Sequence, residues 1–291
     1  MKLRSLLTAT AVCGFSCLSG CITTGGGQGA ATSWVAETGP VYPGITSYVV
    51  MDAHDQHVVL AHDANTKRPI ASLTKIATAV VVLDYLRNAQ LDAGELMTVP
   101  SQVQLLGGPG AAALQPGDQL SIRDGLYAAM IASDNYAAET LAAHIGQKMT
   151  AQGMGSNPMS AFLQQMNSLA ANVGMRDTRF ANAHGLDIQR GYSTAADMAR
   201  LTIHALNVPG FSFYCSQPGR RITVIRAGQA QGVSISTTNE LLFKGGIDGV
   251  KTGTTDLAGQ CLIVTAPKAS TVVKLPDNST LVTQNRLVVV E

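Results

Sequence analysis

The sequence Ala-Ser-Leu-Thr-Lys at residues 71–75, with the apolar run at residues 76–86 behind it, is the most informative stretch of the chain. Apolar residues recur in this run at helical spacing and also occupy its other faces, which predicts a buried central helix. A preceding proline disfavours an earlier start, so the helix should begin near Ala71. Ser72 and Lys75 then share a face of the first turn, with the amine within reach of the hydroxyl.

This serine and lysine have the chemistry of a nucleophile and its base. A serine hydroxyl attacks well only after a neighbouring base takes its proton. A lysine becomes that base when burial or a second cation lowers its pKa towards neutrality. Serine and lysine are common residues, however, and a capping serine before a solvent-facing lysine gives the same spacing. The rest of the chain must therefore distinguish the two interpretations.

Composition narrows the class of protein. The chain has 291 residues, of which 46% are hydrophobic, enough for one large domain or two modest ones. Only 13% of residues are charged, the formal net charge is +1, and no basic run is present, so we expect no nucleic-acid partner. Three histidines between residues 54 and 62 lack the ligand spacing of a zinc site. We expect neither a metal nor a cofactor.

The first 44 residues have the pattern of an exported lipoprotein. Residues 1–20 combine a short positive head with an apolar segment, as a secretory signal peptide does. They end in Leu-Ser-Gly before Cys21, which resembles a bacterial lipobox whose cysteine is lipidated, although an ordinary signal peptide is the alternative. Residues 21–44 would be the lipidated cysteine and a flexible linker. Ile22, rather than an aspartate, follows this cysteine, which resembles lipoproteins sorted to the outer membrane. We therefore expect a periplasmic protein attached to a membrane through its N-terminal lipid, and Ile22 favours the outer membrane.

The remaining pattern predicts an α+β fold. Two apolar runs at 45–52 and 57–61 indicate a hairpin. Helices are expected at residues 121–130, 136–145, 156–173 and 194–206, and short strands at 221–225, 232–237, 250–254, 260–266, 271–275 and 286–290. Strands at both ends suggest one antiparallel sheet assembled from the two termini, beside a mostly helical middle.

Two further motifs carry polar groups at points where a site could form. Ser133-Asp134-Asn135 separates two apolar helices, and such buried polar loops need partners. Lys251 and Thr252 precede Gly253 in a late strand, where they could hold a carboxylate while the glycine lets substrate approach the backbone. Taken alone, Lys251-Thr252-Gly253 is more typical of a strand that enters a turn.

Together, the three motifs form the ordered set of penicillin-binding proteins and class A β-lactamases. Residues 48–52, 69–75, 182–186 and 258–262 extend the resemblance to the exported D-alanyl-D-alanine carboxypeptidase and endopeptidase family, the low-molecular-mass penicillin-binding proteins. The resemblance implies a β-lactamase/DD-peptidase-like fold and a catalytic domain at residues 45–291. It also implies hydrolysis of D-alanyl-D-alanine or cross-link bonds in peptidoglycan stem peptides, through an acyl-enzyme that β-lactams inhibit.

The resemblance assigns the catalytic roles as follows. Ser72 would attack the carbonyl of the penultimate D-alanine, and Lys75 would act as the general base. Lys251 would help to keep Lys75 neutral by like-charge repulsion. Ser133 would relay the proton to the leaving amine.

The same resemblance assigns the substrate-binding groups. Asn135 would bind the substrate amide and help to hold Lys75. The terminal carboxylate would meet Lys251, Thr252 and Thr254, in the strand that contains Gly253. The backbone N–H groups of Ser72 and Thr254 would form the oxyanion hole. Asp134 receives no direct role.

Several alternatives stay open at this point. Class A β-lactamases add a glutamate that activates the deacylating water, but residues 140–239 contain no glutamate, so a bound penicillin should persist. Family members usually continue past the last strand into a helix, which we expect to be missing here because the sequence ends at Glu291. A catalytically weak peptidoglycan-binding or partner-binding lipoprotein is therefore the second hypothesis. A Cys215–Cys261 disulfide, the oligomeric state and the choice between carboxypeptidase and endopeptidase are left open.

Overall fold

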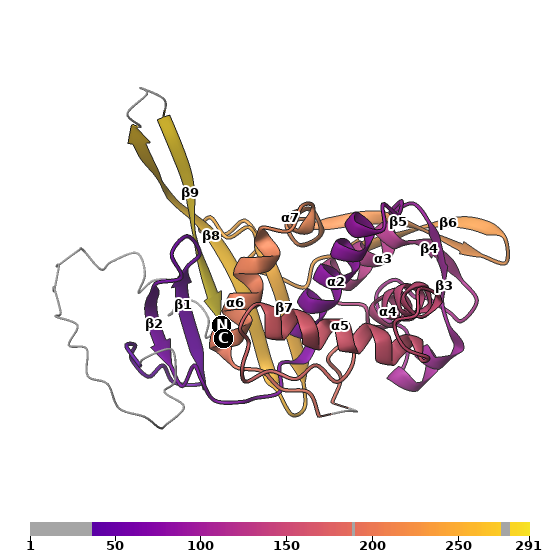
Figure 1. Cartoon of the computed structure of the whole chain (residues 1–291), viewed down its shortest axis with the longest axis horizontal. Coiled ribbons are helices and arrows are strands. Elements are labelled where there is room, and N and C mark those ends of the chain that lie inside the picture. Colours follow the sequence, from indigo (N-terminus) through magenta and orange to yellow (C-terminus); the bar gives the residue numbers. More distant parts are fainter. Residues whose placement is uncertain (1–36, 188–189, 275–279) are drawn as a thin grey trace.

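A five-stranded antiparallel sheet joins the two ends of the chain (Figure 1). The structure, a computed structural model, describes residues 37–187, 190–274 and 280–291, so the predicted signal peptide and Cys21 lie outside the described residues. The strand order is β2-β1-β9-β8-β7, and Val50 in β1 pairs with Val289 in β9. The strands are β1 (Tyr48–Asp52), β2 (Val58–His62), β7 (Gly249–Thr255), β8 (Gly259–Lys274) and β9 (Thr280–Val290). The predicted N-terminal hairpin and its union with the late strands are confirmed.

A second antiparallel sheet has four strands in the order β3-β4-β5-β6. Its strands are β3 (Leu96–Thr98), β4 (Gln119–Ser121), β5 (Gly219–Arg226) and β6 (Gln229–Ser236). The prediction that 221–225 and 232–237 join a single terminal sheet was therefore wrong. Their partners β3 and β4 have three residues each, too few to show the alternation by which strands are recognised.

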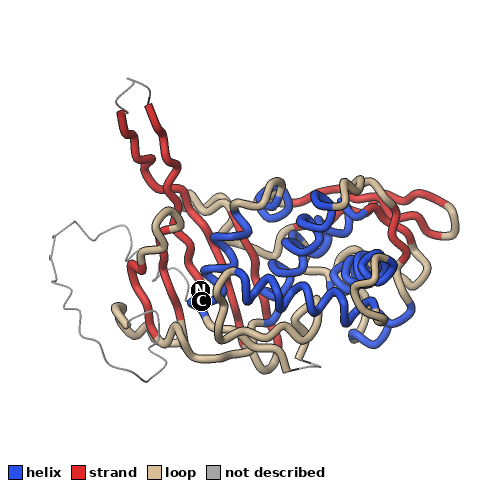
Figure 2. Tube along the Cα trace, in the orientation of Figure 1, coloured by secondary structure: helices blue, strands red, loops and turns tan. Residues whose placement is uncertain are grey.

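The helices gather on one side of the five-stranded sheet (Figure 2). They are the 3₁₀ helices η1 (Ala71–Thr74) and η2 (Ser101–Leu106) and the α-helices α2 (Lys75–Asn88), α3 (Ile122–Ile131), α4 (Asn135–Ala151), α5 (Pro158–Asn172), α6 (Ala195–Leu206) and α7 (Phe211–Cys215). Two starts follow from side-chain caps, since Asp124 N donates to Ser121 Oγ and Asp197 N donates to Thr194 Oγ1, each at 3.0 Å. The predicted helices are confirmed within a few residues, apart from α4, which continues one and a half turns further.

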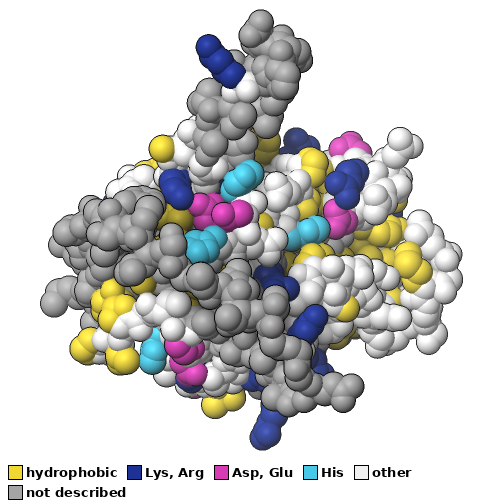
Figure 3. Space-filling view, turned by 60° about the vertical axis from the view of Figure 1, so that its left-hand side comes forward, with side chains coloured by type: hydrophobic (Ala, Val, Ile, Leu, Met, Phe, Trp, Pro, Cys, Tyr) yellow, Lys and Arg dark blue, Asp and Glu magenta, His cyan; other side chains and the backbone are white. Residues whose placement is uncertain are grey.

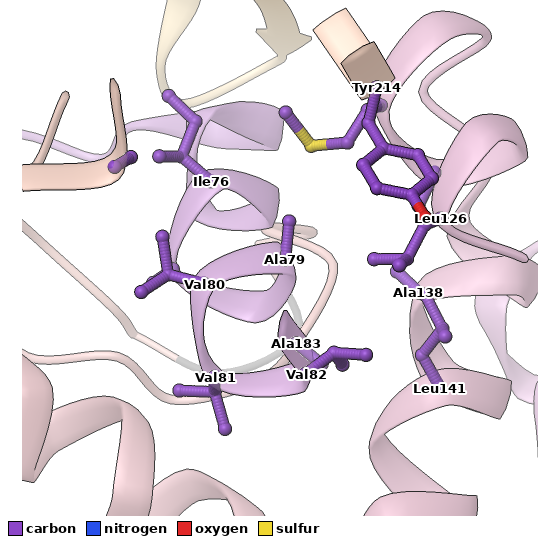
Figure 4. Packing of buried hydrophobic residues seen from close by; sticks show 14 of the residues in the cluster. Ile76, Ala79, Val80, Val81, Val82, Leu126, Ala138, Leu141, Ala183 and Tyr214 are labelled. Carbon is purple, nitrogen blue, oxygen red and sulfur yellow. The ribbon is translucent and has the colours of Figure 1, made fainter. Parts of the chain in front are cut away.

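Helix α2 is buried on nearly every side, as its sequence predicts. Ile76 and Val80 are fully buried, and burial of such a side chain contributes about 1.5–3 kcal/mol. Figure 4 shows residues of α2 beside side chains from α3, α4 and α7: Ile76, Ala79, Val80, Val81 and Val82 near Leu126, Ala138, Leu141 and Tyr214. Because α2 is held on nearly every side, the residues at its start have a fixed position.

The N-terminal segment packs against the β1–β2 hairpin. Thr38 N and Gly39 N both donate to Ala61 O, at 3.1 and 2.8 Å. The Tyr48 hydroxyl donates to Pro40 O at 2.7 Å. The folded part therefore begins before Ile45, the residue at which the catalytic domain was predicted to start.

Strands β8 and β9 extend beyond the sheet as a two-stranded arm (Figure 1). Their pairing continues to Lys274 opposite Thr280, with an irregularity between Lys268 and Thr271. Residues 271–275 were expected to form a separate strand, but residues 271–274 continue β8.

The described surface carries both signs of charge. Lys268 pairs with Asp52 at 2.8 Å, and Arg87 pairs with Asp84 at 2.9 Å. Figure 3 shows basic and acidic side chains interspersed over the face that it presents. No helix in the described ranges is both long enough and apolar enough to cross a membrane. Cys215 and Cys261 are both free thiols, so the structure contains no disulfide between them.

Candidate active site

The three motifs meet where η1, α4 and β7 come together. Lys75 Nζ lies 2.8 Å from Ser72 Oγ and 2.7 Å from Asn135 Oδ1, which joins the first motif to the second. The third motif packs directly against the first, because a Cβ added to Gly253 would lie 2.9 Å from Ser72 N. Gly253 is therefore required for β7 to approach the start of η1 this closely. Ser72 itself lies in the 3₁₀ turn ahead of α2, and Lys75 is the first residue of α2.

The contacts of Lys75 allow a neutral amine to turn its lone pair towards Ser72. Its third partner is His184 O, at 2.7 Å. The carbonyl oxygens of Asn135 and His184 can only accept hydrogen bonds, and a neutral amine has two N–H groups to give them. The Ser72 hydroxyl is the one partner of the three that carries a proton. When the amine is neutral, its remaining lone pair is placed to receive that proton.

Burial also lowers the basicity of the two motif lysines. Lys75 is fully buried, and burial, with the nearby Lys251 as the second cause, holds the pKa of its amine well below the usual value. Burial lowers the pKa of Lys251 to about 7. Lys75 can therefore be neutral at a pH where an exposed lysine is charged.

Lys251 is a buried cation without a carboxylate partner. It is 1% exposed, and its amine donates to Thr252 O at 2.8 Å. Within residues 37–187, 190–274 and 280–291, no carboxylate lies at ion-pair distance from it. A bound anion would supply the missing counter-charge. Thr254, two strand positions past Thr252, is exposed and can meet a ligand.

Ser133 is held in a strained conformation with its hydroxyl available. Its φ is +58°, in the left-handed region that side chains other than glycine seldom adopt. Ala71, beside Ser72, has a φ of +46°. Such conformations cost about 1–3 kcal/mol each and cluster at functional sites. The Ser133 hydroxyl makes no hydrogen bond to another described residue, so it is free to serve a ligand.

Asp134 anchors the loop that carries Ser133 and Asn135. Its Oδ1 accepts from Ala137 N and caps α4, while its Oδ2 accepts from Ala112 N, both at 3.0 Å. The side chain is 1% exposed. The family resemblance assigned Asp134 no direct role, and its contribution is indirect: it positions its two neighbours. Its place immediately before a helix was the signal that could have indicated this.

We expect Asp134→Ala to lower the free energy of unfolding by about 2–4 kcal/mol, because it removes a helix cap and leaves the buried Ala112 N–H without an acceptor. Urea denaturation would measure the loss. Asp134→Asn keeps one carbonyl oxygen and should lose less. Equal stability of Asp134→Ala and the unaltered protein would contradict this role.

The loop at residues 182–187 supports the site through backbone groups. A Cβ on Gly185, whose φ is +88°, would lie 1.9 Å from Ala71 O, so only glycine fits against η1 here. Leu186 N donates to His184 Nδ1 at 3.1 Å, which leaves the ring proton on Nε2. Burial, and then Lys75, lower the pKa of His184 to about 3, so its ring is neutral. Its Nε2 lies 3.9 Å from the half-buried Glu139.

The sequence singled out residues 182–186 only through family resemblance. The group that contacts Lys75 is the carbonyl of His184, and a backbone acceptor leaves no signal in residue type. Within the described residues, no group of three His, Cys, Asp or Glu side chains could hold a metal ion.

Comparison with known proteins identifies the family. A family model described as D-alanyl-D-alanine carboxypeptidase, Peptidase S11, matches residues 42–275. The chain belongs to this family. Relatives named for two different activities are similar to the chain. The chain is 30% identical over 249 residues to D-alanyl-D-alanine carboxypeptidase DacC of Escherichia coli, covering 81% of this chain and 57% of DacC. It is 31% identical over 221 residues to a D-alanyl-D-alanine endopeptidase of Pseudomonas aeruginosa, covering 75% of this chain and 66% of that protein.

A solved structure of the same fold agrees with the S11 family assignment. Penicillin-binding protein D2 from Listeria monocytogenes, in its ampicillin-bound form, superposes with a TM-score of 0.63 and 27% identity, covering 84% of this chain and 88% of that one. The expected DD-peptidase-like fold is confirmed. The chain spans between about half and two thirds of the length of the curated relatives named above.

Proposed function

We propose that this S11 protein is a serine DD-peptidase that hydrolyses D-alanyl-D-alanine bonds, or D-alanyl-diaminoacyl cross-links, in peptidoglycan stem peptides. The observation that carries the proposal is the buried Lys75 amine, 2.8 Å from the Ser72 hydroxyl, with its other two neighbours able only to accept hydrogen bonds. This is a serine with its base in place. Family membership supplies the substrate class.

The proposed reaction proceeds through an ester on Ser72. Lys75 takes the hydroxyl proton as Ser72 Oγ attacks the carbonyl carbon of the penultimate D-alanine. The backbone N–H groups of Ser72 and Thr254 stabilise the oxyanion. As the C–N bond breaks, the proton returns from Lys75 through the Ser133 hydroxyl to the leaving amine. Water then hydrolyses the ester, which releases the shortened peptide and restores Ser72.

Substrate recognition is assigned to groups around this serine. Asn135 binds the substrate amide while its Oδ1 holds Lys75. The terminal carboxylate lies against Lys251, Thr252 and Thr254, where Lys251 lacks a counter-charge among the described residues. Gly253 lets the substrate and Ser72 approach the same stretch of β7. A β-lactam, whose reactive amide and carboxylate resemble those of the substrate, should acylate Ser72 in the same way.

The intact mass of the purified protein after incubation with excess benzylpenicillin tests this proposal. We expect one covalent adduct that persists over an hour, and its absence in Ser72→Ala. Release of D-alanine from a stem pentapeptide would follow as the assay of hydrolysis. Hydrolysed penicillin without an adduct would identify a β-lactamase instead. If neither an adduct nor hydrolysed penicillin is found, the result would favour a catalytically weak binding protein.

We also propose that the protein acts at the periplasmic face of a bacterial membrane, attached through lipid on Cys21. The support is the sequence of residues 1–33, with its signal-like segment, lipobox-like motif and linker composition. The intact mass of protein extracted from membranes would show the acyl chains, and Cys21→Ser would abolish them. A soluble, unacylated mature protein would refute the attachment.

A further inference from the structure

A second concave site lies away from the candidate active site, at the other ends of two helices that begin there. Helix α2 runs from Lys75 to Asn88, and α4 runs from Asn135 to Ala151. A groove with a cavity volume of about 440 Å³ is lined by the C-terminal halves of these helices and by α5. That volume lies in the range of sites for small organic ligands. We call it the distal groove.

The walls of the distal groove carry neutral polar groups. Four carboxamides and one hydroxyl line it: Asn88, Gln152, Gln165, Asn172 and Ser168. The side chains of Asn88, Gln152, Ser168 and Asn172 make no hydrogen bond to another described residue, and Gln165 has only a 3.9 Å contact with the Met154 sulfur. Carboxamides and hydroxyls both donate and accept. These groups are therefore available to a ligand that also does both.

The floor of the distal groove is apolar. Val81, Met149 and Leu169 line it and are buried, at 6%, 3% and 9% exposure. Tyr85 adds an aromatic ring with a hydroxyl at its tip. The complementary ligand presents one apolar face to this floor and hydroxyl or amide groups to the walls.

The charge of the distal groove excludes an anionic ligand. Among the described residues that line it, Asp84 alone is charged, and its carboxylate pairs with Arg87 at 2.9 Å. No lysine or arginine of the described chain lines the groove, so a phosphate or carboxylate would meet the negative charge of Asp84 and no lining cation. Because Arg87 already pairs with Asp84, the groove offers no free carboxylate to a cation either, and a neutral ligand fits best.

We propose that the distal groove binds an N-acetylated sugar segment of the peptidoglycan strand. Such a sugar has an apolar ring face, hydroxyls and an acetamido group, and it matches the floor and walls described above. The identity of the polymer rests on the proposed function; the class of ligand rests on the groove alone.

The distances show which sugar can occupy the distal groove. Along α2 the groove begins at Val81, about 9 Å from Lys75, and reaches Asn88, about 20 Å from it, at 1.5 Å rise per helical residue. The part of a stem pentapeptide between its last peptide bond and its sugar has four residues and reaches about 14 Å. The sugar that carries the reacting peptide therefore does not reach the Asn88 end of the groove. A neighbouring unit of the polymer would fill that end, giving the enzyme two points of contact and a higher effective concentration of stem peptides.

Binding to Ser72→Ala, which cannot turn over substrate, tests the groove directly. The probe is a peptide-free oligomer of N-acetylglucosamine, titrated by calorimetry, with a cello-oligosaccharide of equal length as the sugar without acetamido groups. We expect saturable binding of the N-acetylated oligomer with a dissociation constant below about 10 mM, and binding at least about fivefold weaker for the other sugar.

A matched pair of variants in the same background locates the binding. Gln152→Ala/Asn172→Ala removes two carboxamides from the walls of the groove. Gln147→Ala/Gln164→Ala removes two exposed carboxamides of α4 and α5 that lie outside the groove. We expect the first pair to weaken binding of the N-acetylated oligomer at least about fivefold and the second to leave it unchanged. No saturation up to about 10 mM, or equal weakening by both pairs, would overturn the proposal.

Kinetics separate this inference from the proposed function. In the protein with Ser72 intact, Gln152→Ala/Asn172→Ala should raise KM for soluble glycan strands that bear pentapeptides by about fivefold, and leave kcat/KM for the free pentapeptide unchanged. Penicillin acylation without sugar binding would refute the distal groove alone. Sugar binding without acylation or D-alanine release would refute the proposed function alone.

Discussion

Lys75→Met is expected to slow acylation of Ser72 by benzylpenicillin about 10²–10⁴-fold, the usual contribution of a general base. Methionine has a side chain of similar length but no lone pair that can take the Ser72 proton. Within the described structure, the Lys75 amine is the only side-chain base at hydrogen-bond distance from the Ser72 hydroxyl. The second-order rate constant of adduct formation, followed by mass spectrometry, measures the effect.

The same variant should remain folded. Its loss of two hydrogen bonds leaves Asn135 Oδ1 and His184 O without a donor, at a cost of about 1–3 kcal/mol each. Removal of a buried amine offsets much of that cost, because burial disfavours the charged form. We therefore expect a small change in Tm. Lys244→Met, at an exposed lysine, is the matched control and should alter neither rate nor Tm. Normal acylation in Lys75→Met would mean that another group is the base.

Local signals explain what could be predicted from the sequence. The apolar run behind Lys75 predicted α2 because a helix buried on all sides needs apolar residues on all sides. Ser121 and Thr194 predicted helix starts because a cap acts within three residues. The motif residues Ser72, Asn135 and Gly253 were expected together, and the structure brings them to one place.

Non-local contacts explain what could not be predicted. The second sheet depends on β4 pairing with β5 across about a hundred residues, where Gln119 lies opposite Ile225. The support of Lys75 by the His184 carbonyl spans 109 residues and uses a backbone atom. The hydrogen bond from Ala112 N to the Asp134 side chain joins the start of α4 to a loop, and the sequence of that loop has no distinctive feature. Each of these contacts arises from tertiary packing, so residue type and spacing do not reveal it.

KM for a substrate with a free terminal carboxylate is expected to rise with pH by about tenfold per unit above pH 7. The rise should stop at the pKa that Lys251 has when the carboxylate is bound. The reason is the pKa of Lys251, which burial lowers to about 7 in the free protein. Below that pH the amine is an ammonium ion that attracts the carboxylate, and above it the amine is neutral. A bound carboxylate favours the charged form, so binding at alkaline pH must first supply a proton to Lys251.

The pH dependence of kcat should have the opposite sign, because it reports the other lysine. Lys75 acts as a base only when neutral, and burial holds its pKa well below the usual value, so kcat should fall as the pH is lowered. Steady-state kinetics between pH 5.5 and 9 separate the two effects. A substrate whose terminal carboxylate is amidated lacks the partner of Lys251, and its KM should stay level across the alkaline range. If KM of the carboxylate substrate also stays level, Lys251 keeps its charge in the free enzyme or binds no carboxylate, and the assignment of Lys251 as the anion site fails.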